Sequence, residues 1–134
     1  MNAIVKVTDF EEPGFVYSSM SLNTIEEKKT FHNAIQNPEY KISDFINRSF
    51  VCKDVFMQKA LIHGDDDCEK EVIQTIFVTA EGTGIISNSI GIAKSLVSIL
   101  NIFGEPADWG FEGLEFEVKE VNFKNGRYFK LLVK

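Results

Sequence analysis

The pattern of apolar residues between Ser49 and Val133 constrains the fold more than any other feature of the chain. Alternation of apolar and polar residues predicts strands, and apolar residues about three to four positions apart predict a helix. The region then contains three strands, one helix and two further strands, namely Ser49–His63, Glu71–Ala80, Thr83–Asn88, the helix Ser89–Phe103, Leu114–Phe123 and Arg127–Val133. The Asn125-Gly126 pair between the last two strands is the strongest short signal for a tight hairpin turn.

This order of elements is that of the OB-fold, a small, partly open barrel that binds oligonucleotides and oligosaccharides. At 134 residues the chain is expected to form one domain. We expect a mainly β protein with short helices, in which residues 48–134 form a five-stranded barrel closed by the final hairpin. Residues 1–47 are expected to form an N-terminal arm, which pairs with a barrel edge or frays, and a docking helix that begins at an Asn23 cap and ends at Asn37-Pro38.

The first strand carries apolar groups on both faces. Strict alternation places Phe50, Cys52 and Phe56 on one face and Val55 and Met57 on the other. A long, coiled strand shared by both halves of a barrel has this pattern, and we expect a bulge near Lys53-Asp54.

Bulk composition limits the function classes. The formal net charge is −6, which argues against a nucleic-acid coat held by overall charge alone. The charge is unevenly distributed, since no acidic residue follows Glu120 while four basic residues do. No apolar run approaches the roughly 20 residues of a membrane span, and the two cysteines, Cys52 and Cys68, are expected to be free thiols in a reducing cytoplasm.

No metal site, cofactor or catalytic constellation is expected. The run Asp65-Asp66-Asp67 lies near His63 and Cys68, but it lacks the spacing of a calcium loop or a zinc site. We interpret it as a solvated loop. Because its acids would repel a nucleic acid, we expect it to swing outward or to lie off the path of any strand that binds nearby. The two histidines of the chain occur on different predicted elements, so we expect a protein that is not an enzyme.

Several segments together resemble a known family. They are the Asn23–Glu27 stretch that leads into Phe31-His32-Asn33-Ala34, the strand Glu71–Phe77, the serines Ser87 and Ser89 before the helix with Ala93 and Leu96, and the terminal hairpin. In these the chain resembles the small single-stranded DNA-binding proteins of tailed bacteriophages, especially those of protein-primed replication. The resemblance implies an OB-fold protein that coats single-stranded DNA in the host cytoplasm without sequence preference. It implies no catalytic residues and no cofactor, with phage replication proteins as further partners and a monomer or weak homo-oligomer as the expected state.

A single-strand binder needs aromatic side chains on which bases stack and cations for the phosphates. Our stacking candidates are Phe77, on the more polar face of the second strand with Thr75 and Thr79, and Tyr128, which shares a face with Lys130. For Phe77 the alternative is a core position. Trp109 is a third candidate, with packing over the barrel end as its alternative, and Phe56 is a weaker one.

The phosphate track is expected at the final hairpin. Lys124, Arg127 and Lys130 would form it, and Lys53 and Lys59 of the first strand would extend it. The alternative is an ordinary solvated hairpin tip, where lysine is common. Two other functions stay open on the sequence: an OB-fold module that binds a phage or host protein, which the acidic composition favours, and RNA binding.

Overall fold

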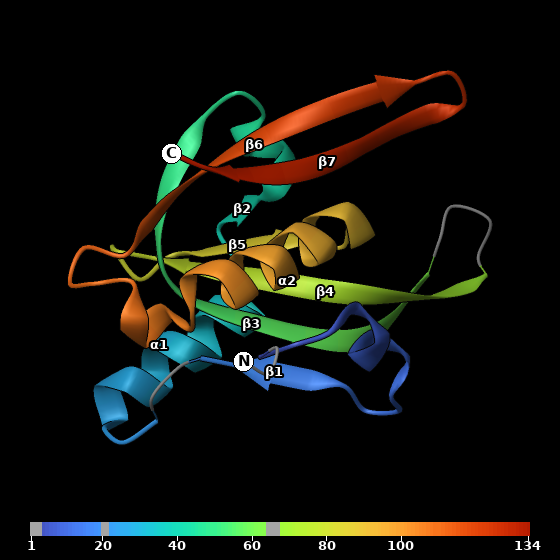
Figure 1. The fold of residues 1–134 in the computed structure, drawn as a ribbon. Coiled ribbons are helices and arrows are strands. Elements are labelled where there is room, and N and C mark those ends of the chain that lie inside the picture. Colours follow the sequence, from blue (N-terminus) through green and yellow to red (C-terminus); the bar gives the residue numbers. More distant parts are fainter. Residues whose placement is uncertain (1–3, 20–21, 64–67) are drawn as a thin grey trace.

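The computed structural model describes residues 4–19, 22–63 and 68–134. These residues form one mainly β structure with two α-helices and three short 3-10 turns (Figure 1). In chain order the elements are η1 (Val7–Glu11), β1 (Val16–Ser18), α1 (Ile25–Gln36), β2 (Tyr40–Lys41), η2 (Ile42–Phe45), β3 (Ser49–His63), β4 (Glu69–Thr79), β5 (Gly84–Ser87), α2 (Ile90–Phe103), η3 (Pro106–Asp108), β6 (Leu114–Phe123) and β7 (Gly126–Val133).

The strands form one curled sheet in the order β2-β5-β4-β3-β6-β7, with β1 paired to β3 beside this path. The pairs β3–β4, β4–β5, β3–β6 and β6–β7 are antiparallel, whereas β2 pairs with β5 in parallel. Among the described residues β7 pairs with β6 alone, so the sheet curls into a half-barrel whose expected closure by the final hairpin is not seen.

Strand β3 is the centre of the sheet and changes partners along its length. Its first residues pair with β6, and Phe56–Gln58 pair with β1 of the arm. The expected bulge is present, as a register shift between Cys52 and Asp54. Because the bulge adds one residue, it reverses the faces after it.

The faces assigned to β3 by strict alternation are therefore wrong beyond the bulge. Phe50, Cys52, Val55 and Met57 all belong to the main core. Phe56 points to the other side of the sheet, where its ring contacts Phe31 of α1 at 5.4 Å between centroids.

Strand β4 is buried on both faces, because a helix covers each one. Phe77 belongs to the main core with α2, whereas Ile76 and Val78 pack under α1 against Ala34. The expectation that Thr75 and Phe77 lie on an exposed polar face is wrong, since neither has any exposed surface.

Helix α2 fills the hollow of the curled sheet, between β7 and β4 in Figure 1. Its capping agrees with expectation. The Ser89 hydroxyl accepts a hydrogen bond from the Ile92 amide, and Gly104 ends the helix with a positive φ of 83° that favours glycine. Within the described residues, no helix has the length and apolar character to span a membrane.

The N-terminal segment packs against the face of the sheet that α2 covers. Arm residues Val5 and Phe10 are buried, and Asn101 of α2 holds the arm backbone by hydrogen bonds with Ile4 and Val5. Pairing of β1 with β3 is thus the alternative that the structure adopts. Helix α1 is capped by Thr24 rather than Asn23, and the capping box is completed by Glu27, one residue later than expected.

Candidate nucleic-acid interface

Strands β6 and β7 form a two-stranded ribbon that extends past α2 (Figure 1). Pairing runs without interruption from Phe116 opposite Val133 to Phe123 opposite Gly126. The two-residue turn that joins the strands is Lys124-Asn125, one residue before the expected Asn125-Gly126, and Gly126 is the first residue of β7. Near the core the ribbon is buried on one side. Beyond it both strands are largely exposed, which brings polar and aromatic side chains to the surface.

The two faces of the ribbon follow from strand alternation. Phe116, Val118 and Leu131 point into the core, as expected. The residues of opposite parity, which face away from the core, are joined by the cross-strand pairs of Lys119 with Lys130 and of Val121 with Tyr128. We call this surface the ribbon face and define it as Lys119, Val121, Phe123, Tyr128 and Lys130.

An exposed aromatic pair occupies the tip of the ribbon face. Phe123 and Tyr128 have ring centroids 6.0 Å apart and ring planes tilted by 45°. Phe123 is 53% exposed and Tyr128 is 44% exposed, so part of each ring meets solvent. Sequence analysis singled out Tyr128 and missed Phe123, although the alternation of the strand from Phe116 already assigns Phe123 to the outward face.

Lysines flank these rings. Lys119 and Lys130 lie directly opposite each other, an arrangement in which like charges repel. Glu117 relieves part of this repulsion through an ion pair with Lys119 at 2.7 Å, and the same contact lowers the pKa of Glu117. Within the described part of the chain Lys124 and Lys130 have no ion-pair partner, so their charge is available to an anion.

Arg127 lies on the opposite face of the ribbon from Tyr128 and Lys130. It forms an ion pair with Glu120 at 3.1 Å, and its guanidinium carbon is 5.7 Å from the centre of the Phe129 ring. The phosphate track expected from Lys124, Arg127 and Lys130 is therefore divided between two faces.

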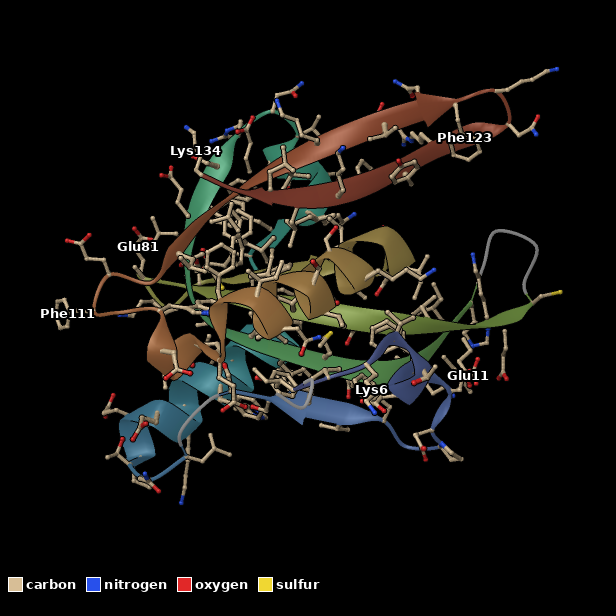
Figure 2. The ribbon with its side chains drawn as sticks, viewed as in Figure 1. Lys6, Glu11, Glu81, Phe111, Phe123 and Lys134 are labelled. Atoms are coloured by element: carbon tan, nitrogen blue, oxygen red, sulfur yellow. The ribbon has the colours of Figure 1, made fainter. Side chains whose placement is uncertain are left out.

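The lysines expected to extend this track are engaged elsewhere. Lys59 has only 15% of its side chain exposed and forms an ion pair with Glu71 at 3.3 Å. Lys53 donates a hydrogen bond to the backbone carbonyl of Phe111 and lies 5.2 Å from the centre of that ring. Figure 2 shows Phe111 and Phe123 at opposite ends of the molecule, so Lys53 is remote from the ribbon tip.

The other aromatic candidates are enclosed. Trp109 is 9% exposed, and its indole N–H donates to the Gly104 carbonyl at 2.9 Å while its ring packs on Phe116. Of the two alternatives for Trp109, packing rather than stacking on a base therefore agrees with the structure. Phe77 and Phe56 are buried in the two cores and do not offer a ring face to a ligand.

A pocket with a volume of about 720 Å³ lies between η1, β4 and the start of α2. The two lysines that line this pocket lie near acidic residues. Lys59 forms an ion pair with Glu71, and Lys70 shares the lining with Glu11. This balance of charge makes it a poorer site for a polyanion than the ribbon face.

Burial shifts the pKa values of three titratable groups outside the ribbon. Burial raises the pKa of the Cys52 thiol, which therefore stays protonated, and burial also raises the pKa values of Tyr17 and Asp54. Across residues 4–19, 22–63 and 68–134, no group of three His, Cys, Asp or Glu side chains is placed to hold a metal ion. The run Asp65-Asp66-Asp67 lies outside the described residues, so its interpretation as a solvated loop stays a prediction.

Comparisons of this chain with protein-family models, with curated proteins and with solved structures give no match.

Proposed function

We propose that this protein binds single-stranded DNA without sequence preference and coats it during phage genome replication. The observation that carries the proposal is the ribbon face, where two exposed rings in mutual contact lie beside two lysines on a protruding pair of strands. Stacking on aromatic rings tolerates every base, and cations that follow the backbone recognise phosphate alone. The same arrangement therefore explains affinity and the lack of sequence preference.

The topology supports an OB-fold as the framework of this interface. The strands from β3 to β7 lie in the order β5-β4-β3-β6-β7, and α2 connects the third of them to the fourth. In OB-folds the loop between the fourth and fifth strands flanks the bound oligonucleotide. The corresponding loop here is the Lys124-Asn125 turn at the tip of the ribbon.

The acidic composition is compatible with this function because the ribbon is locally basic. The ribbon face has Lys119 and Lys130, and Lys124 stands at the adjoining turn. Lys119 is paired with Glu117, so Lys124 and Lys130 would neutralise about two phosphates of a single strand and give a log-log salt slope of about 1.4. Each stacked base would add roughly 1–3 kcal/mol, so stacking rather than charge would supply most of the affinity.

The test is a titration of dye-labelled oligo-dT followed by fluorescence anisotropy. Intrinsic Trp109 emission would be a poor reporter, because that ring is buried. Tyr128→Ala should weaken binding by about 5- to 150-fold, which corresponds to the loss of one stacked base. Phe111→Ala is the matched control, since Phe111 is also exposed and next to a lysine but lies at the other end of the molecule. Equal affinity of the wild type and the Tyr128 variant would overturn the proposal.

The rival function is a module that binds another protein. The net charge of −6 and the 93% exposed Phe111 ring favour it, since exposed aromatic rings are typical anchors of protein interfaces. A partner protein captured through Phe111, together with no binding of oligo-dT at low salt, would select this rival. Competition between oligo-dT and oligo-U in the same assay separates DNA from RNA binding.

A further inference from the structure

A second cluster of aromatic rings and a cation lies next to the ribbon, on residues that the sequence analysis did not single out. Tyr40 is 43% exposed, and its ring is 5.5 Å from that of the half-buried Phe45. The guanidinium carbon of Arg48 lies 5.3 Å from the centre of the Phe45 ring. The cluster therefore combines an accessible ring face with a cation, which are the two components that a single strand requires.

The cluster packs against the main core. The Phe45 ring packs edge-on against the buried Phe50 ring, which in turn contacts Phe77 and Phe116. The Arg48 amide donates to the Phe45 carbonyl, and the Arg48 guanidinium donates to the Asp44 carbonyl. These contacts hold the ring and the cation in a fixed relation, so little ordering entropy is lost when a ligand binds.

Backbone hydrogen bonds tie this cluster to the ribbon. Asn47 donates its amide to the Val118 carbonyl at 2.8 Å, and Val118 donates its amide to the Arg48 carbonyl at 3.3 Å. Asn47 adopts a left-handed φ of 61°, a conformation that asparagine tolerates better than most residues. This local turn makes both hydrogen bonds possible and leads the chain into β3.

A side-chain contact continues the connection on the ribbon face. Lys119 donates to the Asn47 side-chain oxygen at 3.5 Å, and Asn47 is the immediate neighbour of Arg48. The cations thus follow one another from Lys130 through Lys119, its cross-strand partner, to Arg48. A bound strand that leaves the ribbon face in this direction would meet Arg48 next.

An open pocket accompanies the cluster. Its volume of about 510 Å³ is within the usual range of small-molecule sites, and its lining includes Tyr40, Phe45 and Arg48 together with Thr79 and Thr83. Two carboxylates also line it, Glu81 and Glu115. Glu115 accepts a hydrogen bond from the Ser49 hydroxyl at 2.6 Å, and Arg48 has no carboxylate partner within the described residues.

We propose that Tyr40, Phe45 and Arg48 form a second nucleotide subsite, in which a single strand already stacked on Phe123 and Tyr128 continues past Lys119. This inference rests on the proposed function. A base stacks on Tyr40 and Phe45, and the Arg48 guanidinium binds the adjoining phosphate. The interface then has two separate stacking positions, and an oligonucleotide must be long enough to reach both of them.

Oligo-dT of two lengths tests this inference, about 4 and about 16 nucleotides, which span the usual range of sites on one OB-fold. Tyr40→Ala and Arg48→Ala should each weaken binding of the long oligonucleotide by about five-fold or more and leave binding of the short one unchanged. Tyr40→Phe keeps the ring and should bind like the wild type. Tyr128→Ala should weaken binding of both lengths, and Phe111→Ala should weaken neither.

The outcomes separate the second subsite from the function on which it rests. If Tyr128→Ala weakens binding while Tyr40→Ala and Arg48→Ala leave both lengths unchanged, the second subsite is wrong and the proposed function stands. An equal loss for both lengths in the Arg48 variant would also overturn a separate subsite. If Tyr128→Ala leaves binding of both lengths unchanged, the proposed function itself fails. Circular dichroism of each variant confirms that loss of affinity does not reflect loss of folding.

Discussion

Phe123 and Phe111 are exposed rings near tight turns at opposite ends of the molecule (Figure 2), and each has lysines nearby. At the Phe111 end the lysine is already engaged, since Lys53 donates to the Phe111 carbonyl and lies over its ring. At the Phe123 end a second ring, Tyr128, adjoins the first, and Lys130 has no ion-pair partner among the described residues. We therefore propose the Phe123 end, where the cation is available, and not the Phe111 end as the nucleic-acid interface.

The largest expected effect comes from removing both rings at the ribbon tip. The double variant Phe123→Ala/Tyr128→Ala should lose two stacking positions, at roughly 1–3 kcal/mol each, and bind oligo-dT at least about 25-fold more weakly. Anisotropy titration measures the loss. Folding should be little affected, because both side chains lie outside the two cores. A loss of similar size in Phe111→Ala would remove the difference between the two ends.

Gly113→Ala should destabilise the fold near Phe111 without weakening DNA binding. Gly113 has a positive φ of 84°, and a Cβ there would collide with the Cys52 carbonyl, so the free energy of unfolding should fall by about 1–3 kcal/mol. Urea denaturation measures the change. The folded variant should bind oligo-dT as the wild type does, and a weaker affinity under fully folded conditions would place part of the interface at this end.

Lys130→Gln tests whether the charge of this lysine contributes to DNA binding at the Phe123 end. Loss of one phosphate contact should reduce the log-log salt slope by about 0.7 and the affinity in 0.1 M salt by about five-fold. Lys53→Gln, the matched substitution at the other end, should change neither quantity. Titrations at several salt concentrations supply both slopes, and an unchanged slope for the Lys130 variant would contradict its role.

The smallest expected effect concerns Asp54, which lines the same pocket as Lys53 and Gly110. Burial raises the pKa of Asp54 in the folded state, so its contribution to stability is full below the unfolded pKa and is lost as pH rises through the folded pKa. Asp54→Asn removes this loss, and the amide oxygen can still accept the hydrogen bond that Ser19 donates. It should therefore raise the free energy of unfolding at pH 7 by less than about 1 kcal/mol, because the group is partly exposed.

Urea denaturation at two pH values checks this prediction. Below about pH 3 the variant and the wild type should be equally stable, since Asp54 is then largely protonated in both states. A larger gain at acidic than at neutral pH would contradict the assigned sign.

Local patterns predicted the secondary structure well. The bounds of Ser49–His63 and Leu114–Phe123 agree with β3 and β6, and the final hairpin turn is displaced by one residue, to Lys124-Asn125 instead of Asn125-Gly126. Turn chemistry, helix caps and strand alternation depend on neighbouring residues, so a sequence reveals them. The sequence also predicts the bulge at Cys52–Asp54, but strict alternation ignores that the bulge reverses the faces of β3 after it.

Non-local contacts explain what the sequence did not reveal. Phe77 was assigned to a possible surface because Thr75 and Thr79 share its face, yet α2 covers that face from a later part of the chain. Likewise Lys53 is engaged by Phe111, 58 positions later in the chain, and no local pattern predicts that pairing. Arg48 and Tyr40 were missed because their relation to the ribbon depends on the hydrogen bonds between Asn47 and Val118.

The most direct test of the central claim is an amide chemical-shift titration of the ¹⁵N-labelled protein with oligo-dT. The largest shifts should fall on the ribbon, at Lys119, Phe123, Tyr128 and Lys130, and the turn that carries Phe111 should be unchanged. Largest shifts at Phe111 and Lys53, or no shifts at low salt, would contradict the account.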